Sequence, residues 1–142
     1  MYDRLLVAVD HSEVTGRLLS AAQELALLSG GEVWVLHLRE HEFAGKAPGG
    51  QGLPSTETSD AARADLDAAV RRLTEAGVKA QGEMRNTLFG HAAREIVNDA
   101  KAHDVDMIIM GSRGRGDMAG LLVGSTAHKV MHLSDRPVLV VR

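Results

Sequence analysis

Three glycines and a serine stand at spacings that suit the binding of a phosphate group. Gly111 and Gly114 follow a short apolar run, and Gly124 and Ser125 come where a helical pattern begins. The backbone N–H groups of a glycine-rich turn are bare, and a helix start adds the positive end of its dipole. The pattern therefore predicts an anion site, with phosphate as the expected ligand.

A carboxylate, Asp10, ends the first apolar run of the chain. A carboxylate beside a polyphosphate is tolerated when a cation lies between them, so Asp10 predicts Mg²⁺ or Mn²⁺ held through water or phosphate. Asp10 also admits a structural interpretation, as a turn residue or a cap of the first helix. Arg113 and Arg115 have two interpretations as well, a phosphate contact or a solvated surface.

The histidines and the glycine stretch do not predict a catalytic residue. His128 and His132 have the i, i+4 spacing of a metal-binding pair, but no third ligand is suitably placed, so we expect no metal there. His37 falls within a predicted strand and is expected to be structural, whereas His11 beside Asp10 is the histidine to test for chemistry. The stretch has no Walker lysine and the chain has no catalytic triad. These absences favour a protein that binds its phosphate-bearing ligand and hydrolyses it slowly or not at all.

Composition and length predict one domain spanning residues 1–142. The chain is 44% hydrophobic and 25% charged with a net charge of −3, so it lacks the basic balance of nucleic-acid-binding proteins. It has no cysteine, which excludes disulfides and fits a reducing compartment. The first apolar run, residues 5–9, is too short for a signal peptide or a membrane span. We expect a cytoplasmic protein that binds neither nucleic acid nor membranes.

Short β-rich runs alternate with helical patterns along the chain. Near-continuous apolar runs indicate strands covered on both faces, and Ser12 and Gly30 are the expected N-cap and stop of the first helix. Residues 39–59 have no period and predict a long flexible loop, either a lid over the ligand or a disordered segment. The predicted strands are 4–9, 32–38, 78–85, 106–110 and 138–141, and the later helices are 60–76, a segment opening at Gly90, and 125–133.

This alternation predicts an α/β fold with a doubly wound, five-stranded parallel sheet of order 3-2-1-4-5 and helices on both faces. We expect the strand of residues 78–85 near an edge of the sheet. Right-handed crossovers make the winding reverse between the first and fourth strands, and ligands bind at the carboxyl ends of strands at such a point. Those two strands end at Asp10 and Gly111, so the carboxylate and the glycine stretch are expected to flank one cleft.

Taken together, these residues resemble the universal stress protein family over the whole chain. The first strand with Val9-Asp10-His11-Ser12 is similar to the start of that family, and the segment 35–38 to its second strand. The terminal half, from Ile108 to Arg142, resembles the family as well. The pattern Gly-x2-Gly-x9-Gly-Ser/Thr marks the nucleotide-binding branch of the family, and this chain carries it in full.

The resemblance implies a role for each matching position. It implies ATP, ADP or AMP as the ligand, with Mg²⁺ or Mn²⁺. Asp10 would lie by the ribose or, through metal and water, by the phosphates. Leu38 stands where valine is frequent in the family, a small departure if its contact is through the main chain. The implied contacts are Ala8, Val9 and Leu38 for adenine, Met110, Gly111 and Gly114 for ribose and phosphates, and Gly124, Ser125 and Thr126 for phosphates.

Three functions remain open at this point. The first is an ATP-binding regulatory protein of the stress response, the second a slow ATPase or adenylating enzyme, and the third a protein-interaction module in which the nucleotide is structural. The last strand, 138–141, is apolar and expected at a sheet edge, where strands normally pair with something. The resemblance implies antiparallel pairing with a second copy, giving a homodimer; the sequence indicates no particular protein partner.

Overall fold

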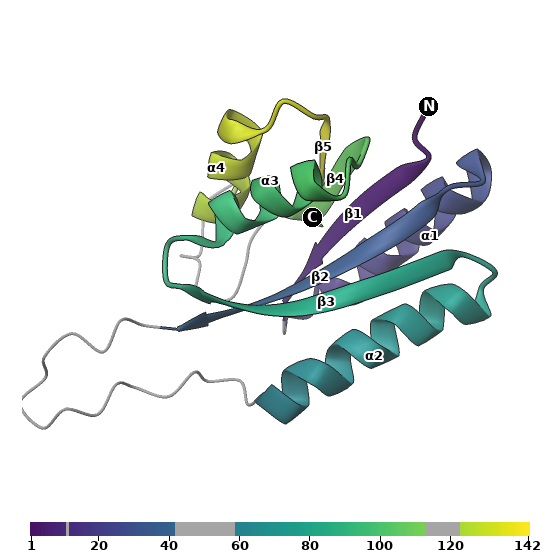
Figure 1. The fold of residues 1–142 in the computed structure, drawn as a ribbon, viewed down its shortest axis with the longest axis horizontal. Helices are drawn as coiled ribbons and strands as arrows, with labels where there is room; N and C mark the ends of the chain where they lie inside the picture. Colours follow the sequence, from purple (N-terminus) through teal and green to yellow (C-terminus); the bar gives the residue numbers. More distant parts are fainter. Residues whose placement is uncertain (11, 42–58, 113–122) are drawn as a thin grey trace, which may run out of the picture.

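The computed structural model describes residues 1–10, 12–41, 59–112 and 123–142, and its elements alternate as predicted (Figure 1). Five strands and four helices follow one another in these described residues. In chain order they are β1 (Arg4–Val9), α1 (Thr15–Ser29), β2 (Glu32–His41), α2 (Ser59–Glu75), β3 (Lys79–Leu88), α3 (Ala92–Ala102), β4 (Met107–Gly111), α4 (Ser125–Leu133) and β5 (Val138–Val141).

The strands form one parallel sheet in the order β3-β2-β1-β4-β5, which confirms the predicted topology. β1 is the central strand, with β2 paired on one side and β4 on the other. β3 lies at one edge, as the sequence predicted, and β5 at the opposite edge. At the amino ends of the first three strands, Glu32 forms ion pairs with Arg4 and Lys79. The distances are 3.8 Å from Arg4 Nε to Glu32 Oε1 and 2.9 Å from Lys79 Nζ to Glu32 Oε2.

Two helices cover each face of the sheet, and each pair encloses its own apolar core (Figure 1). α1 and α2 pack on one face through side chains such as Leu18, Leu66 and Leu73. α3 and α4 pack on the other face through Ile96 and Val130. Because both faces are covered, the central strands carry the near-continuous apolar runs that the sequence showed.

Glycines permit one helix end and one close approach in this arrangement. Gly30 ends α1 in the left-handed region with φ of 70°, as the sequence predicted. Gly82 of β3 lies directly beneath α2: a Cβ atom there would stand 2.7 Å from Leu66 Cδ1 and 2.8 Å from the Val35 carbonyl oxygen. A side chain at position 82 would therefore separate α2 from the sheet.

The start of α1 was predicted wrongly. The helix begins at Thr15 with Val14 at the N-cap position, and no side chain caps it. Ser12 instead lies in the turn before it, where its carbonyl oxygen accepts from the Thr15 amide at 3.3 Å. The Thr15 hydroxyl donates to the carbonyl oxygen of Asp10 at 2.7 Å. This local bond closes the turn, and the helix begins only after it, at Thr15.

Both partners of the β2–β3 pair are longer than predicted. Pairing runs from Glu32 opposite Lys79 to His41 opposite Leu88, so β2 continues into the segment predicted as a loop. Arg39 lies in this extension, 9% exposed, and donates to Asn86 Oδ1 at 3.2 Å. Charged residues interrupt the apolar run here, so the sequence pattern did not predict this part of the strand. The question of a lid over the ligand concerns residues that lie outside the described part of the chain.

No helix within the described ranges is long and apolar enough to cross a membrane.

Candidate functional site

The ends of β1 and β4 lie side by side at the centre of the sheet. The two strands pair in parallel from Leu5 opposite Met107 to Val7 opposite Ile109, and both continue toward the same edge. β1 is followed there by Asp10, and β4 ends at Gly111. The topology thus brings the predicted carboxylate and the start of the glycine stretch to one end of the molecule, at the point where the winding of the sheet reverses.

Three of the predicted site residues share the face of the sheet that α3 and α4 cover. Met110 is buried, and Ala8 and Leu38 are half-buried against the same apolar core. Val9 points the other way and packs in the core beneath α1 and α2. The side chains of Ala8, Leu38 and Met110 thus lie on one face of the sheet, and that of Val9 lies on the other.

α4 begins at the position that the glycine–serine pattern predicted. Gly124 is its N-cap residue, in extended conformation with φ of −66° and ψ of 161°, and Ser125 is the first helical residue. The first i→i−4 bond runs from the His128 amide to the Gly124 carbonyl oxygen at 3.0 Å. The amides of Ser125 and Thr126 precede that bond, so they are donors available at the positive end of the helix dipole.

Backbone hydrogen bonds fix this helix start against the end of β4. The Gly124 amide donates to the carbonyl oxygen of Ser112, and the Ser112 amide donates to the carbonyl oxygen of Val141 at 2.8 Å. Ser112 is 6% exposed, so both bonds are shielded from water. The two ends of the glycine-rich loop therefore meet next to the last strand. Gly114, Arg113 and Arg115 lie between them, outside the described residues.

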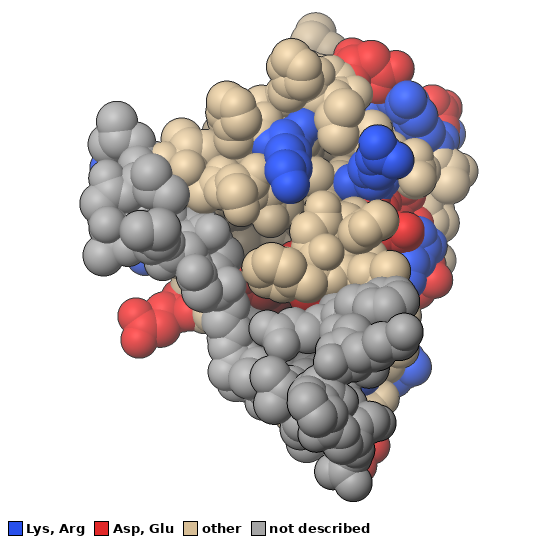
Figure 2. Space-filling model, turned by 90° about the vertical axis from the view of Figure 1, so that its left-hand side faces the viewer, with Lys and Arg blue, Asp and Glu red and all other residues tan. Residues whose placement is uncertain are grey.

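Figure 2 looks onto the face toward which the β2 arrow points in Figure 1, and shows basic side chains among uncharged ones in its upper middle, with further acidic and basic side chains along its right-hand side. Asp10 is half-buried. His11, which the sequence singled out for testing, lies outside the described residues.

Three of the other histidines that the sequence analysis considered lie within the described residues. His37 is fully buried within β2, which agrees with a structural role, and His128 and His132 are both exposed on α4. Within the described ranges, the residues close enough together to share a metal ion are Glu83, Asp99 and His103. Sequence reasoning missed this group. A signal was available, because Asp99 and His103 follow Ile96 and Ala100 at helical spacing along the inner side of α3.

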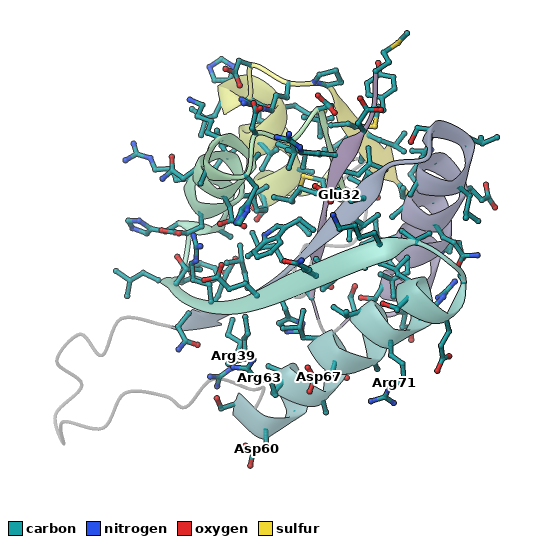
Figure 3. The ribbon with its side chains drawn as sticks, turned by 45° about the vertical axis from the view of Figure 1, so that its right-hand side comes forward. Glu32, Arg39, Asp60, Arg63, Asp67 and Arg71 are labelled. Carbon is teal, nitrogen blue, oxygen red and sulfur yellow. The ribbon has the colours of Figure 1, made fainter. Side chains whose placement is uncertain are left out.

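A shallow groove of about 350 Å³ lies elsewhere, between α2 and β3. Arg63, Asp67 and Arg71 follow one another along one side of α2 above it (Figure 3). Its apolar part is formed by Leu66, Val70 and Gly82. None of the predicted site residues lines this groove, and it lies at the outer edge of the sheet, where no winding reversal brings strand ends together.

Comparisons with known proteins agree with this fold. The family model described as "Universal stress protein family" matches residues 1–142. Universal stress protein YxiE of Bacillus subtilis is 34% identical, with all of both chains covered. The solved structure of a universal stress protein from Archaeoglobus fulgidus superposes with a TM-score of 0.73 at 26% identity, covering all of both chains.

A second solved structure, a universal stress protein in complex with cAMP, matches with a TM-score of 0.68 at 26% identity, covering 99% of this chain and 97% of that one. The family model spans every residue of the sequence, and the sheet order agrees with the prediction made from the residues alone. This chain belongs to the universal stress protein family.

Proposed function

We propose that this chain binds an adenine nucleotide at the carboxyl ends of β1 and β4. The observation that carries the proposal is the fixed start of α4, where the Gly124–Ser112 bond presents the amides of Ser125 and Thr126 beside the end of β4. Such amides bind phosphate oxygens well. The cAMP complex of a relative supports adenine as the base.

The proposed ligand is ATP with Mg²⁺ or Mn²⁺, and ADP and AMP are its alternatives. The phosphates would contact Gly111, Gly114 and the start of α4, and the adenine would lie along Ala8, the Val9 backbone, Leu38 and Met110. Asp10 fits a bound cation, because a half-buried carboxylate is the hard oxygen donor that Mg²⁺ prefers and β1 delivers it to the same end of the sheet.

We further propose a regulatory role in the stress response, with slow or no hydrolysis of the nucleotide. Asp10 is the one acid among the proposed contacts, and its charge would be engaged by the cation rather than available as a general base. The nucleotide then acts as a bound signal whose loading state changes the surface of the protein. The lack of cysteine supports a cytoplasmic location.

A homodimer through β5 completes the proposal. β5 is an edge strand of the sheet, and its four residues Val138–Val141 are all apolar. Leu139 is 36% exposed, and Met131 and Leu133 of α4 are 41% and 46% exposed. An apolar edge with open N–H and C=O groups favours pairing with another strand. A second copy supplies such a strand in antiparallel orientation.

The test of nucleotide binding is calorimetry of the full chain with ATP, ADP, AMP and cAMP, each with and without saturating Mg²⁺. We expect one ligand per chain and tighter binding of ATP when Mg²⁺ is present. The Gly114→Val variant should lose binding, because a side chain there obstructs approach of the phosphates to the backbone. Chromatography of ligand released from the purified protein identifies the natural nucleotide, and phosphate release measures hydrolysis.

The matched control is Gly16→Ala, since the nearest atom to an added Cβ there is Arg72 Nη1 at 4.0 Å. This variant should bind nucleotide like the unaltered protein. Absence of heat with all four nucleotides, together with absence of any released nucleotide, would refute the proposal. Unchanged affinity in Gly114→Val would place the phosphates elsewhere.

A further inference from the structure

A polar cluster of residues that are not proposed nucleotide contacts lies between β2, β3 and α3. Trp34 of β2 stacks on His103, with ring centroids 3.8 Å apart and an angle of 29° between the planes. Asp99 of α3 is 1% exposed, although it is a carboxylate. Trp34 is the third residue of β2, whereas Glu83 and Arg85 of β3 lie opposite Leu36 and Leu38, so the cluster extends along the strands from near their amino ends.

The buried carboxylate of Asp99 is held by two donors. Its Oδ2 accepts from Trp34 Nε1 at 2.6 Å, and its Oδ1 accepts from Arg85 Nη2 at 2.7 Å. Each carboxylate oxygen has two lone-pair positions, so Oδ1 keeps one acceptor position beyond the bond from Arg85. The orientation of the carboxylate is thus fixed, and it retains capacity for another partner.

His103 faces that remaining position across a gap. Its Nε2 lies 3.7 Å from Asp99 Oδ1, which is too long for a direct hydrogen bond. Zn²⁺ binds nitrogen and carboxylate oxygen at about 2.0–2.2 Å, so two of its tetrahedral ligand atoms stand about 3.3–3.6 Å apart. The gap is therefore close to the separation of two atoms that share a metal ion. One oxygen of Glu83 lies within 4.8 Å of both, which supplies a third ligand atom.

The cluster contains more negative than positive charge. Arg85 pairs with Glu83 at 3.1 Å, Glu95 at 3.2 Å and Asp99 at 2.7 Å. Partial burial acts to lower the pKa of Arg85, but its hydrogen bonds and the three carboxylates outweigh burial and raise it. One guanidinium thus faces three carboxylates, which leaves two excess negative charges among these four groups. A divalent cation balances that excess.

We propose that Glu83, Asp99 and His103 bind a divalent first-row transition-metal ion, with Zn²⁺ the best match to one imidazole and two carboxylates. Trp34 and Arg85 are positioning residues, because ligating carboxylates are normally held by hydrogen bonds from such neighbours. Mg²⁺ is disfavoured, since it prefers oxygen ligands alone. The site ties the end of α3 to β3, and none of its three ligands is a proposed nucleotide contact.

Trp34 makes the test direct, because it is the one tryptophan of the chain and stacks on a proposed ligand. Full-length protein is stripped with EDTA, exchanged into buffer without nucleotide, and titrated with Zn²⁺ by calorimetry and by tryptophan fluorescence. We expect a fluorescence change that saturates at one equivalent, with Mg²⁺ at the same concentration causing none. Binding should weaken in mild acid, because imidazole must be deprotonated to ligate.

Two variants test the ligands, and two serve as controls. His103→Gln and Glu83→Gln alter half-exposed side chains, and each should weaken Zn²⁺ binding by at least the about 10- to 100-fold lost when a partner of a metal ligand is removed. His128→Gln and His132→Gln remove the exposed pair on α4 and should leave the fluorescence titration unchanged.

Three outcomes would overturn the metal site. They are a Zn²⁺ response unaltered in His103→Gln, a response lost in His128→Gln, and a fluorescence change with acid but none with Zn²⁺. In the last case the gap between His103 and Asp99 accommodates a proton rather than a metal. Each outcome is independent of nucleotide binding, because no nucleotide is present in the titration.

Discussion

The backbone amide of Gly124 donates to the carbonyl oxygen of Ser112, and this bond closes the glycine-rich loop on itself. Gly124 and Ser112 are both buried, so the bond is protected from water. Its consequence is geometric: the start of α4 cannot shift relative to the end of β4 without breaking it. Anion binding by backbone amides requires such fixed donors, since flexible amides must be ordered when the ligand binds.

Removing this bond should lower stability and weaken nucleotide binding together. Proline suits the φ of −66° at Gly124, so Gly124→Pro removes the N–H without straining that angle. The buried Ser112 carbonyl is then left without its partner, at a cost of about 1–3 kcal/mol in the free energy of unfolding. Gly124→Ala retains the amide and should lose less stability. Urea denaturation measures the difference, and equal losses in the two variants would contradict the role of the bond.

Gly82 should tolerate no side chain. In Gly82→Ala the added methyl meets Leu66 Cδ1 at 2.7 Å and the Val35 carbonyl oxygen at 2.8 Å, so either α2 or the sheet must move. We expect a loss of about 1–3 kcal/mol in the free energy of unfolding. Gly16→Ala, which adds its methyl to open space on α1, should leave that free energy unchanged or slightly raised. Equal midpoints for both variants in urea would show that α2 adjusts without cost.

Asp99 should contribute to stability as well as to the proposed metal site. Asp99→Asn keeps an acceptor oxygen for only one of two donors, Trp34 Nε1 or Arg85 Nη2, and turns an amide NH₂ group toward the other. The expected loss is about 2–3 kcal/mol in the free energy of unfolding, measured by circular dichroism in the presence of EDTA. Glu95→Gln is the control, because its half-exposed pair with Arg85 should contribute less than about 1 kcal/mol.

The proposed dimer should depend on β5. Deleting the residues after Arg136 removes the strand, but it also removes the bond from Ser112 to Val141 and can unfold the end of the sheet. Leu139→Lys is the sharper variant, since that side chain is 36% exposed and a charge on an edge strand disfavours pairing. Light scattering should report twice the chain mass of 15.2 kDa for the unaltered protein and that mass for the variant. An unchanged dimer in Leu139→Lys would exclude β5 as its interface.

The sequence predicted the fold well where apolar periodicity decides it. The strands β1, β4 and β5 and the sheet order follow from near-continuous apolar runs and from the handedness of crossovers. The last three residues of β2 and of β3 were missed, because polar residues such as Arg39, Glu40 and Asn86 interrupt the apolar pattern and only the pairing of the two strands makes them regular.

The sequence likewise predicted those features of the site that follow from topology, but not those that depend on how the chain turns. Asp10 and Gly111 stand at strand ends, so topology alone brings them to one end of the molecule. The Ser112–Gly124 and Thr15–Asp10 hydrogen bonds were not predictable, because they depend on how the chain turns rather than on residue type. The Trp34–Asp99–Arg85 network joins residues on three separate elements, and no local pattern reveals such a contact.

Because β1 is the central strand of the sheet, its position also affects the order in which the nascent chain folds. The Arg4 amide donates to Asp106 Oδ2, a partner 102 residues later in the chain. At a synthesis rate of about 5–20 residues per second, roughly 5–20 s separate the emergence of the two from the ribosome. Throughout that interval β1 can pair only with β2. The edge of β1 that later pairs with β4 keeps its backbone N–H and C=O groups unpaired. The nascent chain is therefore most vulnerable to mispairing just before β4 appears, a stage at which chaperone contact would protect it.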